Sequence, residues 1–239
     1  MDIFNFTAIG SITSCYKEKF GIPRQPNLVS SAQAELILNQ TFTEESVRGL
    51  DDFSHIWISF VFHASFTTRQ AQDWKPMVRP PRLGGNKKVG VFASRSMFRP
   101  NPMGLSVVEL VGIDYRKSGV VLKLRGSDLM DGTPVLDIKP YLPYADAIPK
   151  AKGGFAQNNP EIKYVVEFSE KAKHESQQAS ERLAQNIELL IQQILQLDPR
   201  PSYQQRTDES RVYSMRLCDF DLKWVYLDDN QIKVLALLS

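Results

Sequence analysis

Positive charge and backbone turns are concentrated in one segment of the sequence, residues 79–105, RPPRLGGNKKVGVFASRSMFRPNPMGL. From Arg69 to Arg99 there are eight basic residues and a single acid, Asp73. Because glycine and proline interrupt the backbone and few apolar residues are available for a core, the segment is typical of a long loop with one short strand. Two interpretations remain open. The segment is either a solvated connection between strands or a surface for an anionic partner such as RNA.

Three further segments have side chains suited to binding or proton transfer. PRQP at 23–26 is a turn bounded by prolines that fixes an arginine and an amide. His63 and Ala64 follow directly on the most apolar stretch, and DLMDGTP at 128–134 places two carboxylates three positions apart in a tight turn. Each also fits ordinary structure, as a rigid turn or a histidine at the edge of the core. All of them fall at expected strand ends, where ligand sites usually lie.

Several common sites have no support in the sequence. There is no GxGxxG, and LGGNKK at 83–88 lacks the glycine spacing and the following Ser/Thr of a phosphate loop. The three histidines are not at metal-ligand spacing, so we expect no metal site. Cys15 and Cys218 lie far apart without a CxxC partner, which favours reduced thiols and a cytoplasmic protein. No run approaches the ~18 apolar residues of a membrane span, so we expect no membrane partner.

The elements that must position these residues are mainly β in the first 145 residues. Only residues 43–50 have helical character. The run HIWISFVFH at 55–63 is rich in aromatic and β-branched residues, which predicts a strand buried on both faces. The predicted strands are residues 6–11, 34–38, 55–63, 89–93, 106–115, 119–125 and 135–139. Seven short strands with so few helices predict a single, closed or nearly closed β-barrel rather than a doubly wound sheet.

A second domain is expected after a linker. The predicted boundaries are a barrel domain at 1–145, a linker at 146–160 and a small α+β domain at 161–239. The α+β domain is expected to contain a strand at 164–168 and then one long helix that begins after Ser169 as N-cap and ends before Asp198. A meander of strands at 211–217, 222–227 and 232–237 follows.

Charge divides unevenly between the two halves. Residues 1–160 carry a net +5 (19 Lys+Arg, 14 Asp+Glu) and residues 161–239 a net −3 (10 and 13). A basic first domain suits a polyanionic partner. The acidic second domain is not expected to bind phosphates in bulk, but Arg200, Tyr203, Arg206 and Arg211 are candidates for a local RNA contact.

Taken together, these segments resemble a known family. The resemblance rests on PRQP, GLDDFSHIWISFVFH, RPPRLGGN, GVFASRSMFRPNPMGLSVVEL, DLMDGTPVLDIKPYLPYA and DPRPSY. The chain is similar to the TsaA-like family of tRNA methyltransferases, whose bacterial members N6-methylate threonylcarbamoyladenosine at position 37 of threonine tRNA. The resemblance implies a single non-Rossmann β-barrel, S-adenosylmethionine as cofactor, the anticodon loop of threonine tRNA as partner and a homodimer.

The resemblance also implies a cofactor site. The matching positions are Pro23, Arg24, Gln25, His63, Ala64, Arg95, Leu105, Asp131, Gly132, Thr133 and Pro134. The chemistry of these residue types fits the cofactor. Arg95 or Arg24 can hold its carboxylate, and Asp131 can accept from its ribose hydroxyls or pair with its α-amino group. Leu105 would supply an apolar wall, and Gly132 lets the backbone approach closely.

Methyl transfer to N6 requires that the acceptor lose a proton. Asp128 and His63 are the candidate bases, and loss of the proton through water is equally compatible with the sequence. For the tRNA, the expected contacts are Arg79, Arg82, Lys87, Lys88, Arg99, Asn101, Lys139 and Tyr141. Within this group Arg99 or Lys139 would pair with the threonyl carboxylate, and Tyr141, with Phe98 and Trp74, could stack on splayed bases. The rival interpretations are a barrel protein that binds RNA without chemistry and a methyltransferase for a different nucleotide.

Overall fold

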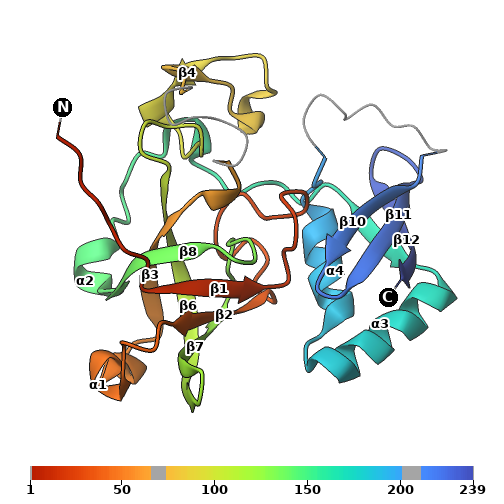
Figure 1. Cartoon of the computed structure of the whole chain (residues 1–239). Coiled ribbons are helices and arrows are strands. Elements are labelled where there is room, and N and C mark those ends of the chain that lie inside the picture. The colour runs from red at the N-terminus through yellow and green to blue at the C-terminus, as the bar shows by residue number, and fades with distance from the viewer. Residues whose placement is uncertain (1, 66–73, 201–210, 239) are drawn as a thin grey trace. The chain divides into compact units, whose positions relative to one another are not determined.

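Six strands close into a β-barrel in the computed structural model, which describes residues 2–65, 74–200 and 211–238 (Figure 1). Around the barrel the strand order is β1-β2-β7-β6-β3-β8. The strands are β1 (Gly10–Ser14), β2 (Gln33–Leu38), β3 (His55–Val61), β6 (Met103–Arg116), β7 (Gly119–Arg125) and β8 (Pro134–Pro140). The predicted single barrel is therefore confirmed, and closure leaves none of its six strands as an open edge.

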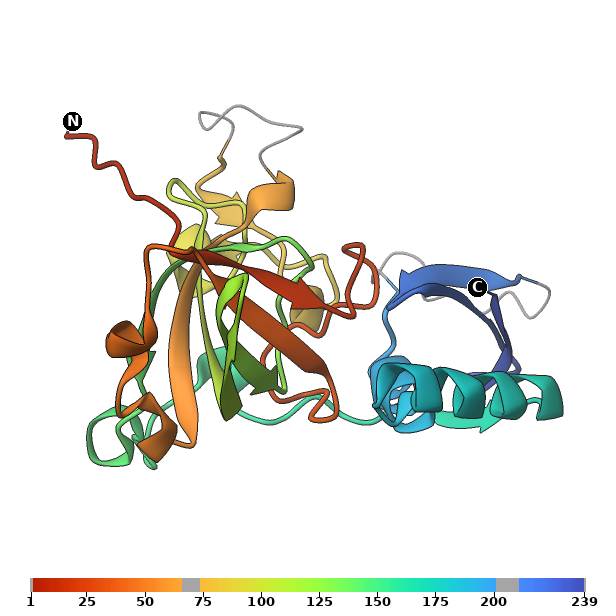
Figure 2. The same cartoon turned by 60° about the horizontal axis from the view of Figure 1, so that its bottom comes forward.

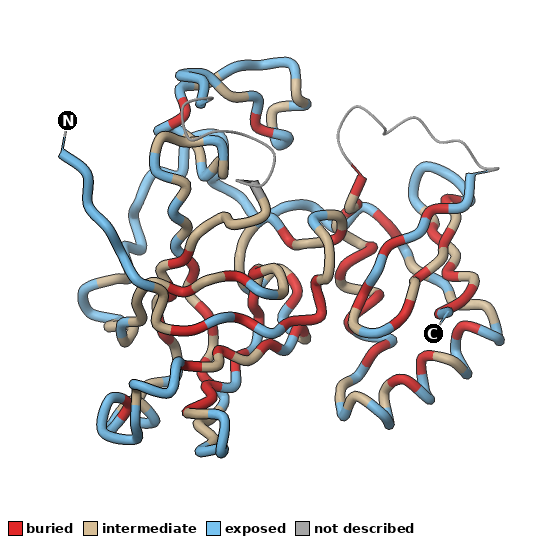
Figure 3. Tube along the Cα trace, in the orientation of Figure 1, coloured by how far each residue is buried: buried red, intermediate tan, exposed pale blue. Residues whose placement is uncertain are grey.

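The strand predictions for residues 89–93 and 55–63 were wrong in detail. Residues 89–93 do not join the barrel. Only β5 (Val89–Gly90) is a strand, and it pairs with β4 (Met77–Val78) in a separate two-stranded sheet before a 3-10 turn at Val91–Ala93. In β3 burial alternates, with Ile56, Ile58 and Phe60 buried and the residues between them half-buried (Figure 3). Strand β3 thus has one core face. The run had indicated two because His55 and Trp57 place aromatic residues on the outer face as well.

Short helices and turns connect these strands. The first predicted strand starts four residues later than expected, at Gly10, and the helical prediction at 43–50 becomes α1 and a 3-10 turn. The connecting elements are α1 (Glu44–Val47), α2 (Pro143–Asp146) and 3-10 turns at Leu50–Asp52, His63–Ser65, Pro81–Leu83 and Gly154–Ala156. No helix in the described part of the chain is long and apolar enough to cross a bilayer.

Gly104 and Phe60 form a cross-strand pair between β6 and β3. A Cβ atom at position 104 would lie 2.1 Å from Cζ of Phe60, whose ring is buried and packs edge-on against Phe62. We therefore expect Gly104→Ala to lower the free energy of unfolding by about 1–3 kcal/mol, the usual cost of overpacking. Gly112→Ala on the same strand is the matched control, since a Cβ at position 112 would have no described atom within 4 Å. Urea unfolding should separate the two variants, and equal midpoints would contradict the prediction.

The second compact unit is built from three chain segments, Ser14–Ala34, Arg125–Asp131 and Asn159–Ser239, and the first unit from Met1–Thr13, Glu35–Leu124 and Gly132–Asn158. In the second unit α3 and α4 cover one face of a four-stranded sheet with order β10-β11-β12-β9 (Figure 2). Its elements are β9 (Val165–Phe168), α3 (Glu170–Leu183), α4 (Ile187–Gln196), β10 (Tyr213–Leu217), β11 (Phe220–Tyr226) and β12 (Gln231–Leu238). The α+β prediction is confirmed, and Ser169 caps α3 by accepting from Ala172 N–H.

The prediction of one long helix was wrong. The apolar 3/4 spacing runs on through a break, where Ala184 adopts a left-handed conformation (φ 49°) and ends α3. Asn186 then caps α4, its side chain accepting from Leu189 N–H at 2.9 Å. Neither glycine nor proline marks the break between the two helices. The only local signal is this asparagine, a preferred N-cap residue.

Candidate functional site

The turn that leads into β8 is held to the barrel by its backbone. Gly132 N–H donates to the carbonyl of Ile12 at 2.7 Å, and Ile12 N–H donates to the carbonyl of Thr133 at 2.9 Å. Gly132 is exposed and has φ +75°, a conformation that favours glycine. Its open backbone would let a ligand approach closely, and its contact with the cofactor stays a prediction.

His63 lies beside this turn. A Cβ atom at Gly132 would be 3.9 Å from Nε2 of His63, which begins the 3-10 turn after β3. Phe62 N–H donates to the carbonyl of Pro102 at 2.9 Å, so the end of β3 is tied to the start of β6. The fold thus brings together two predicted cofactor segments that are about 70 positions apart in the sequence, 63–64 and 132–134.

Leu105 and Arg95 are the two other predicted cofactor residues of the first unit, one as an apolar wall and the other as a cation for the carboxylate. Leu105 pairs with Ser59 on β3 and is 54% exposed, which leaves an apolar side chain at the surface near the end of β3. Arg95 is exposed in a loop of successive serine-stabilised turns. In that loop Ser96 N–H donates to Ser94 Oγ at 3.3 Å and Phe98 N–H to Ser96 Oγ at 3.1 Å.

Asp131 belongs to the second unit and is already bound on both carboxylate oxygens. Ser14 N–H donates to Oδ1 at 2.9 Å, and Lys17 Nζ lies 3.0 Å from Oδ2. Its own N–H donates to the carbonyl of Tyr16 at 2.9 Å. These contacts fix the carboxylate while leaving about a third of the side chain exposed. A direct contact of Asp131 with the cofactor stays a prediction, and Ser14 and Lys17 are functional candidates that sequence reasoning missed.

The remaining predicted cofactor residues and one candidate base also belong to the second unit. In the turn at 23–26 Pro23 is buried, Arg24 is exposed and the Gln25 amide donates to the Arg24 carbonyl. Asp128 is half-buried. Burial mainly, and then the nearby charges of Cys15 and Asp128, raise the pKa of Tyr16. The assignment of Asp128 or His63 as base stays a prediction.

The basic segment is ordered around the β4–β5 ribbon. Arg79, Arg82, Lys87 and Lys88 are exposed, as a phosphate-binding surface requires, and the Arg82 guanidinium donates to the carbonyl of Asn158. Asn101 is exposed as well, and Arg99 is half-buried. Arg69, which was counted with this segment, lies outside the described residues.

Lys139 and Tyr141 lie at the end of β8, on the outer side of the barrel. Lys139 forms an ion pair with Asp137. Tyr141 belongs to an aromatic group in which its ring centroid is 6.1 Å from Trp57 and 6.3 Å from His55. Trp57 Nε1 donates to Asp146 at 3.0 Å, which fixes the orientation of the indole. These aromatic rings pack against one another, and a role of Tyr141 in base stacking stays a prediction.

The second unit corrects one predicted RNA contact. Arg200 is only 1% exposed and donates to the carboxylate of Asp198 at 2.9 Å and to Tyr164 Oη at 2.6 Å. Its guanidinium carbon lies 3.5 Å from the centroid of the Tyr226 ring. Arg200 is therefore part of the core and is not available to bind RNA. Tyr203 and Arg206 lie outside the described residues, and Arg211 is exposed.

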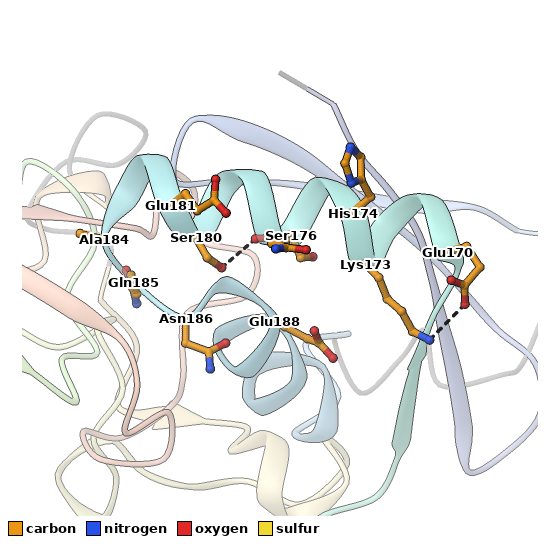
Figure 4. A pocket seen from close by; sticks show the side chains of 11 residues that line it. Glu170, Lys173, His174, Ser176, Ser180, Glu181, Ala184, Gln185, Asn186 and Glu188 are labelled. Carbon is orange, nitrogen blue, oxygen red and sulfur yellow. Dashed lines mark hydrogen bonds and ion pairs between the residues drawn. The ribbon is translucent and has the colours of Figure 1, made fainter.

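A polar groove runs along α3 and α4 of the second unit. Its volume is about 770 Å³, and it is lined by residues such as Glu170, His174, Ser180 and Glu188 (Figure 4). None of the predicted cofactor or tRNA residues lines it. Among the described residues there is also no group of three His, Cys, Asp or Glu arranged to hold a metal ion.

Comparison with known proteins identifies the family. The model of the tRNA-methyltransferase O N-terminal domain matches residues 11–147, and that of the TrmO C-terminal domain matches residues 161–239. The chain belongs to the TrmO family. This confirms the family resemblance, both for the barrel motifs and for the C-terminal part of the chain that contains DPRPSY.

Relatives match almost the whole chain. It is 46% identical over 229 residues to the tRNA (adenine(37)-N6)-methyltransferase of Escherichia coli (strain K12), covering 95% of each sequence. It is 47% identical to a putative S-adenosylmethionine-dependent methyltransferase of Pseudomonas aeruginosa, covering 95% of this chain and 94% of that one. The crystal structure of TrmO from Pseudomonas aeruginosa matches with a TM-score of 0.83 and 39% identity, over 100% of this chain and 99% of the other. Fold and family are thus shared along the full length.

Proposed function

We propose that this chain is an S-adenosylmethionine-dependent tRNA (adenine(37)-N6)-methyltransferase. The observation that carries the proposal is the 46% identity to the Escherichia coli enzyme over 95% of both sequences. The exposed basic residues between β4 and β5 support a tRNA substrate, because arginine and lysine side chains there can neutralise backbone phosphates. We further propose threonylcarbamoyladenosine at position 37 of threonine tRNA as the acceptor, and a cytoplasmic homodimer as the active form.

The residues of the first unit fit the cofactor chemically. The bound cofactor supplies an electrophilic methyl group on a sulfonium. Arg95 offers a cation for its carboxylate, Leu105 an exposed apolar side chain, and Gly132 an open backbone beside His63. Thr133 and Pro134 follow in the same turn, and Ala64 follows His63. We propose these residues as the cofactor site, with Pro23, Arg24, Gln25 and Asp131 as further members.

Methyl transfer from a sulfonium to nitrogen is a displacement. The cofactor already supplies a reactive methyl group, so the protein contributes positioning and desolvation more than electrophilic assistance. His63 or Asp128 would accept the N6 proton, or water would carry it away. Arg99 or Lys139 would hold the threonyl carboxylate, and Arg79, Arg82, Lys87, Lys88, Asn101 and Tyr141 would hold the anticodon loop. The exposed apolar side chains of Met103 (40%), Leu105 (54%) and Phe92 (77%) support a dimer, because such residues are commonly covered at interfaces.

The decisive test is transfer of a tritiated methyl group from S-adenosylmethionine to tRNA. We expect incorporation into threonine tRNA that carries threonylcarbamoyladenosine, and none into the same tRNA made without that modification. Nucleoside mass spectrometry should locate the methyl on N6. Binding of tRNA without transfer would favour the non-catalytic alternative, and transfer to another nucleoside would favour a different substrate.

A further inference from the structure

The two cysteines of the chain, 203 positions apart, meet in the second unit. Cys15 directly follows β1, and Cys218 lies in the turn between β10 and β11 with φ 52°. Cys218 N–H donates to the carbonyl of Cys15 at 2.8 Å, and the adjacent residues Tyr16 and Leu217 form an antiparallel bridge. The two cysteines are therefore directly opposed. Opposed residues in antiparallel strands have Cα atoms about 4.5–5.5 Å apart, within the range of disulfides.

The thiols are in contact and are unequal. A hydrogen bond links the two side chains, lowering the pKa of the Cys218 thiol and raising that of the Cys15 thiol. Burial further raises the pKa of Cys15. The positive charge of Lys17 acts to lower the pKa of both thiols. Cys15 is 6% exposed, whereas Cys218 is partly exposed at the turn. Cys218 is thus the accessible nucleophile, and the buried Cys15 is the resolving thiol.

We propose that Cys15 and Cys218 form a redox-active pair that a low-molecular-weight disulfide, such as glutathione disulfide, converts into an intrachain disulfide. The Cys218 thiolate attacks one sulfur of glutathione disulfide, the S–S bond breaks, and one glutathione leaves as a thiolate that takes up a proton. The Cys15 sulfur, having lost its proton to solvent, then attacks the Cys218 sulfur and displaces the second glutathione. The two cysteine thiols are oxidised by two electrons, and glutathione disulfide is reduced to two thiols.

The position of this pair gives the disulfide a structural consequence. Cys15 lies between Ser14 and Lys17, the two residues that bind the carboxylate of Asp131. A bond to Cys218 would fasten this segment to the β10–β11 turn and close a loop of about 200 residues in the unfolded chain. The oxidised protein should therefore be the more stable form.

The test uses the full chain, incubated over a series of ratios of reduced to oxidised glutathione and then unfolded and alkylated. Wild-type protein should lose both alkylatable thiols together, bind no glutathione, remain monomeric in denaturing non-reducing electrophoresis and yield one linked peptide containing Cys15 and Cys218. Its Tm should rise by about 5 °C or more relative to the reduced form.

Single variants distinguish this route from general thiol oxidation. Cys15→Ser should accumulate one glutathione on Cys218, because the resolving thiol is missing. Cys218→Ser should leave the buried Cys15 unmodified, and neither variant should gain stability on oxidation. Cys15→Ala repeats the first test if Cys15→Ser fails to fold. The proposal is overturned if wild-type protein retains two free thiols at every ratio, stably carries glutathione, or forms only intermolecular disulfides.

Discussion

Replacing Arg200 by alanine is expected to lower the free energy of unfolding by about 3–5 kcal/mol, a large part of the stability of an ordinary domain. The reason is that Asp198, which is 4% exposed, would keep its charge in the core without a partner. The Tyr226 hydroxyl, which donates to Asp198 Oδ1 at 3.1 Å, is neutral and cannot replace the guanidinium. Urea unfolding followed by circular dichroism measures the loss.

Two controls separate charge compensation from side-chain volume. Arg211→Ala removes an exposed guanidinium 4.9 Å from the centroid of the Tyr213 ring and should cost no more than about 1 kcal/mol. The double variant Asp198→Asn/Arg200→Met removes both charges at similar volume and should recover much of the stability lost in Arg200→Ala. An Arg200→Ala protein as stable as Arg211→Ala would contradict the prediction.

Replacing either Arg95 or Asp131 is expected to weaken the binding of S-adenosylmethionine by roughly 10- to 100-fold. This corresponds to the loss of one hydrogen bond to a charged group. Arg95→Ala removes the proposed partner of the cofactor carboxylate, and Asp131→Asn removes a negative charge while keeping the shape of the side chain. Titration calorimetry with the purified protein measures both effects.

Matched variants test whether these residues bind the cofactor or only support the fold. Arg79→Ala removes another exposed arginine of the basic segment and should weaken tRNA binding while leaving cofactor affinity unchanged. Lys17→Met removes the ion-pair partner of Asp131 but leaves its carboxylate in place. If Lys17→Met weakens binding as much as Asp131→Asn, the role of Asp131 is to hold the Ser14–Lys17 segment. Unchanged affinity in both Arg95→Ala and Asp131→Asn would refute the site.

The features that could be predicted from sequence are those that local patterns encode. Runs of β-branched and aromatic residues between turns were sufficient for the barrel, and Ser169 was recognisable as a helix cap. The helix break at Ala184 could not be predicted, because an alanine in the left-handed conformation does not change the hydrophobic spacing. The outer face of β3 was misjudged because His55 and Trp57 on that face pack against Tyr141, which follows β8, and lie outside the core.

The same distinction applies to the candidate site. The segments around His63 and Gly132 could be named in advance because their motifs are contiguous. The contacts of Asp131 with Ser14 and Lys17 could not, since they join residues more than 110 positions apart. The meeting of Cys15 and Cys218 likewise depends on a bridge between Tyr16 and Leu217. Sequence spacing had indicated two unrelated thiols.

The discontinuity of the second unit affects how the chain can reach its native state. Cys15, Tyr16, Val29 and Ala32 are buried in a core that is otherwise supplied by residues 164–237. During synthesis from the N-terminus these side chains therefore stay exposed until almost the whole chain has been made. Closing such distant contacts is slow, because the entropy of a long loop is lost before the contacts form. A fragment ending near residue 145 would keep its barrel strands but leave Tyr16 and Val29 without their packing partners, and we expect it to aggregate.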